Sequence, residues 1–213
     1  MQTQQLRPAS NVTGSLTAVS RRPHVGAHTQ VGHHRLVTHE AGTRHRAQLV
    51  EWLSIHVQLH RKIHRARGFP ANWSYCCIEE LVLTLGYWGI PSPLPPGRDR
   101  GPERMCYSNA SHYGDTHSLT YVEGYALTTV GVGCAHAWCV DDHGNVHDPT
   151  WPDGLGVAYL GLPFAASHIR AFTEKFGNAC LLRDAHLDDY RILREGLSAD
   201  AVVPIGEPVT TRA

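Results

Sequence analysis

The stretch HAWCVDDHGNVHDPTW, residues 136–151, constrains the fold most strongly, because it has the pattern of a tight β-hairpin. The overlapping segment CAHAWCVD, 134–141, is strand-like, DHGN supplies a turn, and VHDPT forms a short return strand. Side chains alternate along a strand, so Cys134, His136 and Trp138 are expected on one face and Cys139 on the other.

The register of this hairpin brings a histidine close to an acid. With Gly144 in the left-handed position of the turn, position 141 faces 145, and the strands then pair outward from there. His136 and Asp148 become diagonal neighbours on one face, with Cβ atoms roughly 7–8 Å apart. An imidazole and a carboxylate can therefore meet there without distortion of the backbone.

Helical patterns precede and follow these strands. Apolar residues at three- and four-residue steps predict a long amphipathic helix that Gly68 and Pro70 end; its members are Leu49, Trp52, Leu53, Val57 and Ile63. That helix is expected over 43–67. The further expected elements are helices over 74–85, 102–114, 163–176 and within 182–197, and a strand over 118–130. Helices, then a small antiparallel sheet, then helices indicate an α+β fold and not alternating βαβ units.

A length of 213 residues fits one domain with a real core. Residues 1–42 are polar and lack a sustained period, so we interpret them as a disordered or loosely docked arm. A single domain is expected over 43–198, and an extended tail over 199–213.

The net charge of zero hides a split along the chain. Residues 1–70 hold ten Lys and Arg against two acids, and nine of the sixteen His. Such a basic segment could meet nucleic acid or an acidic partner. We favour the alternative that it folds back on the acidic remainder of the chain, because neither aromatic interleaving nor a nucleic-acid motif accompanies it.

The sequence shows neither an export signal nor a membrane span. Residues 1–20 contain no apolar core of a signal peptide, and the longest uncharged apolar run, 81–91, is too short to cross a bilayer. The six cysteines follow no secreted disulfide framework and form no CxxC pair. Reduced thiols, a cytoplasmic location and no membrane partner are therefore expected. The adjacent Cys76 and Cys77 would point in different directions on a helix, which indicates two core residues.

A histidine held by a carboxylate is half of a nucleophilic triad, in which the acid fixes the tautomer and steadies the imidazolium. Cys106 is the best candidate for the missing nucleophile. It follows the Pro- and Gly-rich loop 91–102 and lies near a predicted helix N-terminus, where the dipole lowers the pKa of a thiol. Pairing with His136 would lower that pKa further.

Four motifs in order resemble the transglutaminase-like superfamily: CYSNA from Cys106, YVEGY from Tyr121, HAW from His136 and DPTW from Asp148. The segment AYLGLPF, 158–164, is similar to what uncharacterised bacterial and phage members carry after the acid. The resemblance implies a papain-like core, with the Cys-bearing helix packed on the antiparallel sheet. Arg104 and Met105 depart from the small residues that the family often has before its cysteine.

The resemblance implies roles for these residues. Cys106 is the nucleophile, His136 the general base and acid, and Asp148 the residue that orients His136. The backbone N–H of Cys106 would be one oxyanion donor, and a second is expected from Asn72, Trp73 or Trp88. The expected chemistry is acyl transfer from a peptide, protein or small amide through a thioester. Hydrolysis is favoured over transamidation, because nothing identifies a site for an acceptor amine.

Two alternatives remain open at the level of sequence. The chain could be a non-catalytic binding or structural module that keeps the fold, for example in a phage or bacterial assembly. It could instead bind a metal through the ladder His56, His60 and His64, or through His143 and His147 beside the hairpin. No cofactor is expected, and no EF-hand-like acidic loop suggests calcium.

Overall fold

The computed structural model describes residues 30–68, 72–177 and 180–210. The chain divides into two compact units, Met1–Leu36 and Val37–Ala213. Of the first unit, only the helical residues from Gln30 onward are described. The remainder of the predicted N-terminal arm, 1–29, lies outside the described residues.

Helix α1 (Gln30–Arg67) begins well before the predicted start at residue 43 and ends, as expected, just before Gly68. Within the second unit its buried side chains are Leu49, Leu53 and Val57, which recur every four residues. Ile63, which belongs to the predicted apolar pattern, is 36% exposed and does not join them.

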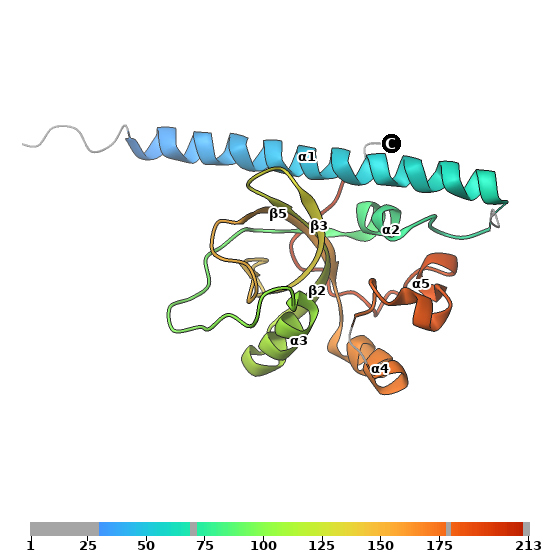
Figure 1. The fold of residues 1–213 in the computed structure, drawn as a ribbon. Coiled ribbons are helices and arrows are strands. Elements are labelled where there is room, and N and C mark those ends of the chain that lie inside the picture. The colour runs from blue at the N-terminus through green and yellow to red at the C-terminus, as the bar shows by residue number, and fades with distance from the viewer. Residues whose placement is uncertain (1–29, 69–71, 178–179, 211–213) are drawn as a thin grey trace, which may run out of the picture. The chain divides into compact units, whose positions relative to one another are not determined.

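The second unit is built on a curled antiparallel sheet (Figure 1). Its strand order is β4-β3-β2-β5-β1-β6. The bounds of the strands are β1 Tyr87–Gly89, β2 Thr120–Thr128, β3 Gly133–Val140, β4 Val146–His147, β5 Gly156–Pro163 and β6 Glu207–Pro208. Strands β2 and β3 and the short return strand β4 were predicted, whereas β1 and β5 were not.

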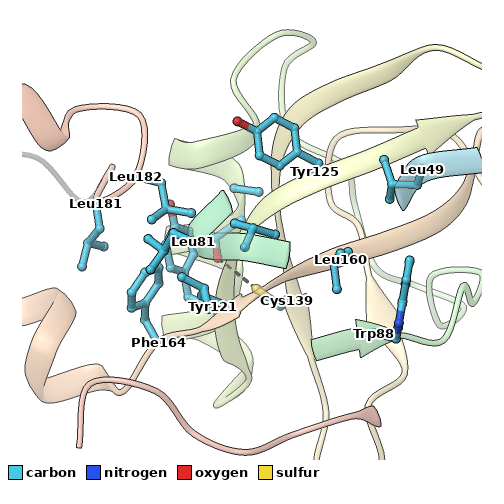
Figure 2. Packing of buried hydrophobic residues seen from close by; sticks show 14 of the residues in the cluster. Leu49, Leu81, Trp88, Tyr121, Tyr125, Cys139, Leu160, Phe164, Leu181 and Leu182 are labelled. Carbon is cyan, nitrogen blue, oxygen red and sulfur yellow. Dashed lines mark hydrogen bonds between the residues drawn. The ribbon is translucent and has the colours of Figure 1, made fainter. Parts of the chain in front are cut away.

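The two faces of the sheet carry separate apolar clusters. On one face, helix α3 (Cys106–His117) covers β3, and the buried Cys139 thiol donates a hydrogen bond to the carbonyl oxygen of Ala110 at 3.1 Å (Figure 2). On the other face, Trp138 packs with Tyr159, Val122 and Val146. Trp138 and Cys139 therefore point to opposite faces, as the alternation predicts.

Three short helical regions complete the unit: α2 (Ile78–Leu85), α4 (Ala166–Phe176) and a broken pair near the C-terminus. The single helix predicted within 182–197 is instead a 3-10 turn, η1 (Ala185–Asp188), and a short α5 (Arg191–Arg194). Asp189 and Tyr190 separate them at φ 49° and 53°, left-handed values that no α-helix accommodates. Helices on an antiparallel sheet make the fold α+β.

Helix α3 also differs from its prediction at both ends. It begins at Cys106 and not at Pro102, because Arg104 has the left-handed φ of 64° and interrupts the helical path. It runs through Gly114 to His117 and is closed by Ser118 at φ 53°. Among the described residues, no helix combines the length and apolar character needed to cross a bilayer.

Candidate active site

The hairpin that carries His136 has the predicted register. Cys139 pairs with His147 and Val140 with Val146, and Gly144 takes φ 78° in the turn. Asp148 directly follows the end of β4. Its Oδ2 lies 2.7 Å from His136 Nε2, and both side chains are buried. The structure thus brings the predicted base and its orienting acid into direct hydrogen bonding.

The carboxylate of Asp148 is held from both of its oxygens. The backbone N–H groups of Thr150 and Trp151 donate to Oδ1 at 2.9 and 3.0 Å, and the hydroxyl of Tyr159 donates to Oδ2 at 3.1 Å. Burial alone would raise the pKa of Asp148, but the hydrogen bond and charge of His136 and the two N–H groups lower it. Asp148 is therefore a fixed anion beside the imidazole.

The ring of His136 is fixed in plane as well as by its hydrogen bond. Trp151 stacks on it with a centroid distance of 4.0 Å and an interplanar angle of 18°. Burial favours the neutral ring, but hydrogen bonds to Asp148 and Cys106 outweigh burial and raise the pKa of His136 to about 8. The imidazolium is consequently favoured at neutral pH.

Cys106 is the first residue of α3 and is half-buried. Because Nε2 of His136 is taken by Asp148, the hydrogen bond between His136 and the thiol falls to Nδ1. Burial would raise the pKa of Cys106, but His136 and the backbone N–H groups of Ala137 and Tyr107 lower it below its ordinary value. The arrangement favours a thiolate–imidazolium pair.

The N–H of Ala137 is free for the thiol because the β3–β4 ladder stops one step short of it. Asp141 N–H donates to Asn145 O, so alternate residues of β3, including Ala137, direct their N–H groups to this edge. In this register Ala137 would face Pro149, which has no N–H to give the ladder. The carbonyl of Pro149 accepts from Gly101 N–H at 2.8 Å instead.

An oxyanion has one evident donor here. As the first residue of a helix, Cys106 carries a backbone N–H with no partner inside that helix. Of the three upstream candidates, Trp88 lies on β1, beyond β2 and β5 from β3, and so away from the edge where Cys106 lies. Asn72 is exposed, and Trp73 packs near the rings of His64 and Tyr190.

Sequence reasoning missed the residues that support the triad. Trp151 is the last residue of the stretch 136–151, and its aromatic side chain could have suggested a ring that stacks on His136. Tyr159 could not be found, because β5 was not recognised and its place beside Asp148 depends on the sheet order. Asn109, which donates to Thr150 Oγ1 at 2.9 Å and so links α3 to the loop after Asp148, gave no signal.

No group of three or more His, Cys, Asp or Glu side chains suited to a metal occurs in the described part of the chain. His56 of the predicted ladder donates from Nδ1 to the carbonyl of Trp52 at 2.8 Å and packs on its ring. His147 lies 3.6 Å from Asp141, and His143 is exposed.

The prediction that Cys76 and Cys77 belong to the core is confirmed for Cys77, which is buried, whereas Cys76 is half-buried. The prediction that they point in different directions is wrong, because their sulfur atoms lie 3.6 Å apart. Helix α2 begins only at Ile78, and Cys77 precedes it with extended backbone at φ −162° and ψ 171°, so helical geometry does not separate the two side chains.

Comparison of the chain with protein-family models, curated proteins and solved structures yields no match.

Proposed function

We propose that the chain performs cysteine-dependent acyl chemistry on an amide or isopeptide bond, by the transglutaminase-like route that its motifs resemble. The observation that carries the proposal is the chain of contacts Cys106–His136–Asp148. Its members come from a helix N-terminus, a strand and a loop. The Cys-bearing helix lies on an antiparallel sheet, an arrangement that agrees with a papain-like core.

Each step follows from the groups in place. The Cys106 thiolate attacks the carbonyl carbon, and the developing oxyanion meets the N–H of Cys106. The His136 imidazolium gives its proton to the leaving nitrogen as the C–N bond breaks, which leaves a thioester and an amine. Neutral His136 then takes a proton from water, which attacks the thioester to release a carboxylic acid and restore the thiol. Hydrolysis is proposed over transamidation, since no acceptor-amine site is identified.

The test is the rate of Cys106 alkylation by iodoacetamide as a function of pH, in wild type and in His136→Ala. We expect rapid labelling of the wild type near neutral pH, and at least a tenfold slower rate in the variant, because the imidazolium no longer stabilises the thiolate. The variant Cys106→Ser measures the background from the other thiols, of which Cys76 and Cys134 are half-buried and have pKa values that burial raises.

The alternative, a non-catalytic module, predicts a different profile. If Cys106 in the wild type reacts no faster than a free thiol of pKa about 8.5, and removal of His136 changes nothing, the enzymatic proposal is refuted.

A further inference from the structure

The face of the sheet opens directly in front of Cys106. Along β3, Cys139 lies under Ala110 of α3, and Ala137 lies against Cys106, the first residue of that helix. The four-residue step from Ala110 to Cys106 covers about 6 Å along the helix, and the two-residue step from Cys139 to Ala137 covers about 6.8 Å along the strand. The helix and the strand therefore advance by nearly the same distance. The next residue of β3 on this face, Ala135, therefore lies past the end of the helix, and it is exposed.

A cavity of about 390 Å³ occupies this place. Ala135, Gly124 and Tyr125 contribute from β3 and β2. Three elements supply the rest of its lining: the N-terminal residue of α2, the second residue of α3 and the segment after α4, through Ile78, Tyr107, Leu182 and Arg183. Tyr107 adjoins the nucleophile in the chain and Ala135 adjoins its base. The position suits the acyl part of a substrate bonded to Cys106.

Among the described residues that line this cavity, Arg183 alone is charged. Its guanidinium lies over the ring of Tyr107, 5.4 Å from the centroid. Asp184 forms an ion pair with Arg183 through Oδ1, which lies 3.7 Å from Nε, within ion-pair range but beyond hydrogen-bond distance, and the Arg183 side chain is 61% exposed. A planar guanidinium held on an aromatic ring, with its outer N–H groups available, is suited to a carboxylate.

A buried carboxylate fixes the segment that carries Arg183. Glu123 on β2 is fully buried and accepts hydrogen bonds from the backbone N–H groups of Leu181 and Leu182 at 2.6 and 2.9 Å. Tyr121 donates to the same carboxylate at 3.0 Å. The backbone next to Arg183 is thereby tied to the sheet, so the guanidinium is presented from a fixed base.

We infer that the cavity over Ala135 selects an acyl donor that carries a carboxylate, which binds the guanidinium of Arg183 while an apolar portion lies against Tyr125, Leu182 and Ile78. This inference rests on the proposed function, since it names the substrate class of the same site. It makes Arg183 a specificity-determining residue.

The test uses two haloacetyl probes built on amidated glutamate and amidated glutamine, which differ only in a carboxylate against a carboxamide. Second-order rates of Cys106 alkylation are measured for wild type, Arg183→Gln and Arg183→Glu. Arg98→Gln is the matched control, because Arg98 contacts His117 at the other end of α3. We expect the glutamate-to-glutamine rate ratio to fall about tenfold in Arg183→Gln, the scale of one charge-assisted hydrogen bond.

The ratio should invert in Arg183→Glu and stay at the wild-type value in Arg98→Gln, with the glutamine probe reacting within about twofold throughout. Rapid labelling by both probes with a ratio indifferent to Arg183 overturns the inference and leaves the proposed function standing. Labelling by either probe no faster than that of a free thiol removes the proposed function and the inference with it.

Discussion

Asp148 illustrates how much of the site depends on single residues. Its carboxylate accepts hydrogen bonds from His136, Tyr159 and two backbone N–H groups, so its position is set before any substrate arrives. The imidazole is in turn fixed by Asp148 at one nitrogen and by Trp151 on one ring face. Only Nδ1 is left to exchange protons with the thiol.

Replacing Asp148 by Asn keeps the size of the side chain and removes its charge. Burial of His136 is then opposed only by the hydrogen bond to Cys106 and the charge of Cys106, so we expect the pKa of His136 to fall from about 8. Alkylation of Cys106 near pH 7 should slow at least tenfold. NMR titration of the imidazole checks the first effect and iodoacetamide kinetics the second. A His136 pKa still near 8 in the variant would contradict this account.

At the scale of elements, the sheet and its connections divide into parts that local sequence determines and parts that it does not. Gly144 and the alternation of 134–141 define the hairpin, so the register and the His136–Asp148 contact could be predicted. The start of α3 could not be placed at Cys106, because it depends on the left-handed Arg104. Nor could β5, whose eight residues are nearly all buried and show no alternation of polar and apolar side chains.

Glu123 connects two elements, β2 and the segment after α4, and makes that connection depend on pH. Burial raises the pKa of Glu123 to about 7, although its N–H and O–H donors oppose the shift. The folded state therefore binds a proton more tightly than the unfolded state. The stability from this proton is full below about pH 4.3, the unfolded pKa, and is lost as pH rises through about 7.

Urea unfolding of wild type at pH 5 and pH 8 should show a lower free energy of unfolding at pH 8, with roughly 3 kcal/mol as the upper limit from Glu123. Glu123→Gln cannot titrate, so its loss between the two pH values should be smaller. His136 contributes in the same direction in both proteins, which makes the difference between them specific to Glu123. Equal losses in the two proteins would show that Glu123 does not titrate in this range.

At the scale of the whole molecule, the second unit has its proposed site at an edge of the sheet and its apolar packing on the two faces. Helix α1 contributes to that packing through Leu49, Leu53 and Val57, and Trp52 lies 5.8 Å from the ring of Tyr125. These contacts all lie after residue 42. The proposed triad comes from α3, β3 and the loop after β4, which lie at one end of the strand order.

Deletion of residues 1–42 should accordingly leave a folded unit. The buried side chains described for α1 remain, so we expect cooperative thermal unfolding with a midpoint within a few degrees of the full chain. The alkylation rate of Cys106 should stay within about twofold. Circular dichroism melting and iodoacetamide kinetics measure both, and loss of cooperative unfolding would show that the deleted segment is structural.

Pro149 has a consequence that reaches beyond the hairpin it ends. In a regular ladder the carbonyl oxygen of Pro149 would accept the N–H of Ala137, but it accepts from Gly101 N–H instead. The N–H of Ala137 is therefore left to the Cys106 thiol. The loop before α3 thereby withholds the partner that would close the sheet over the sulfur atom.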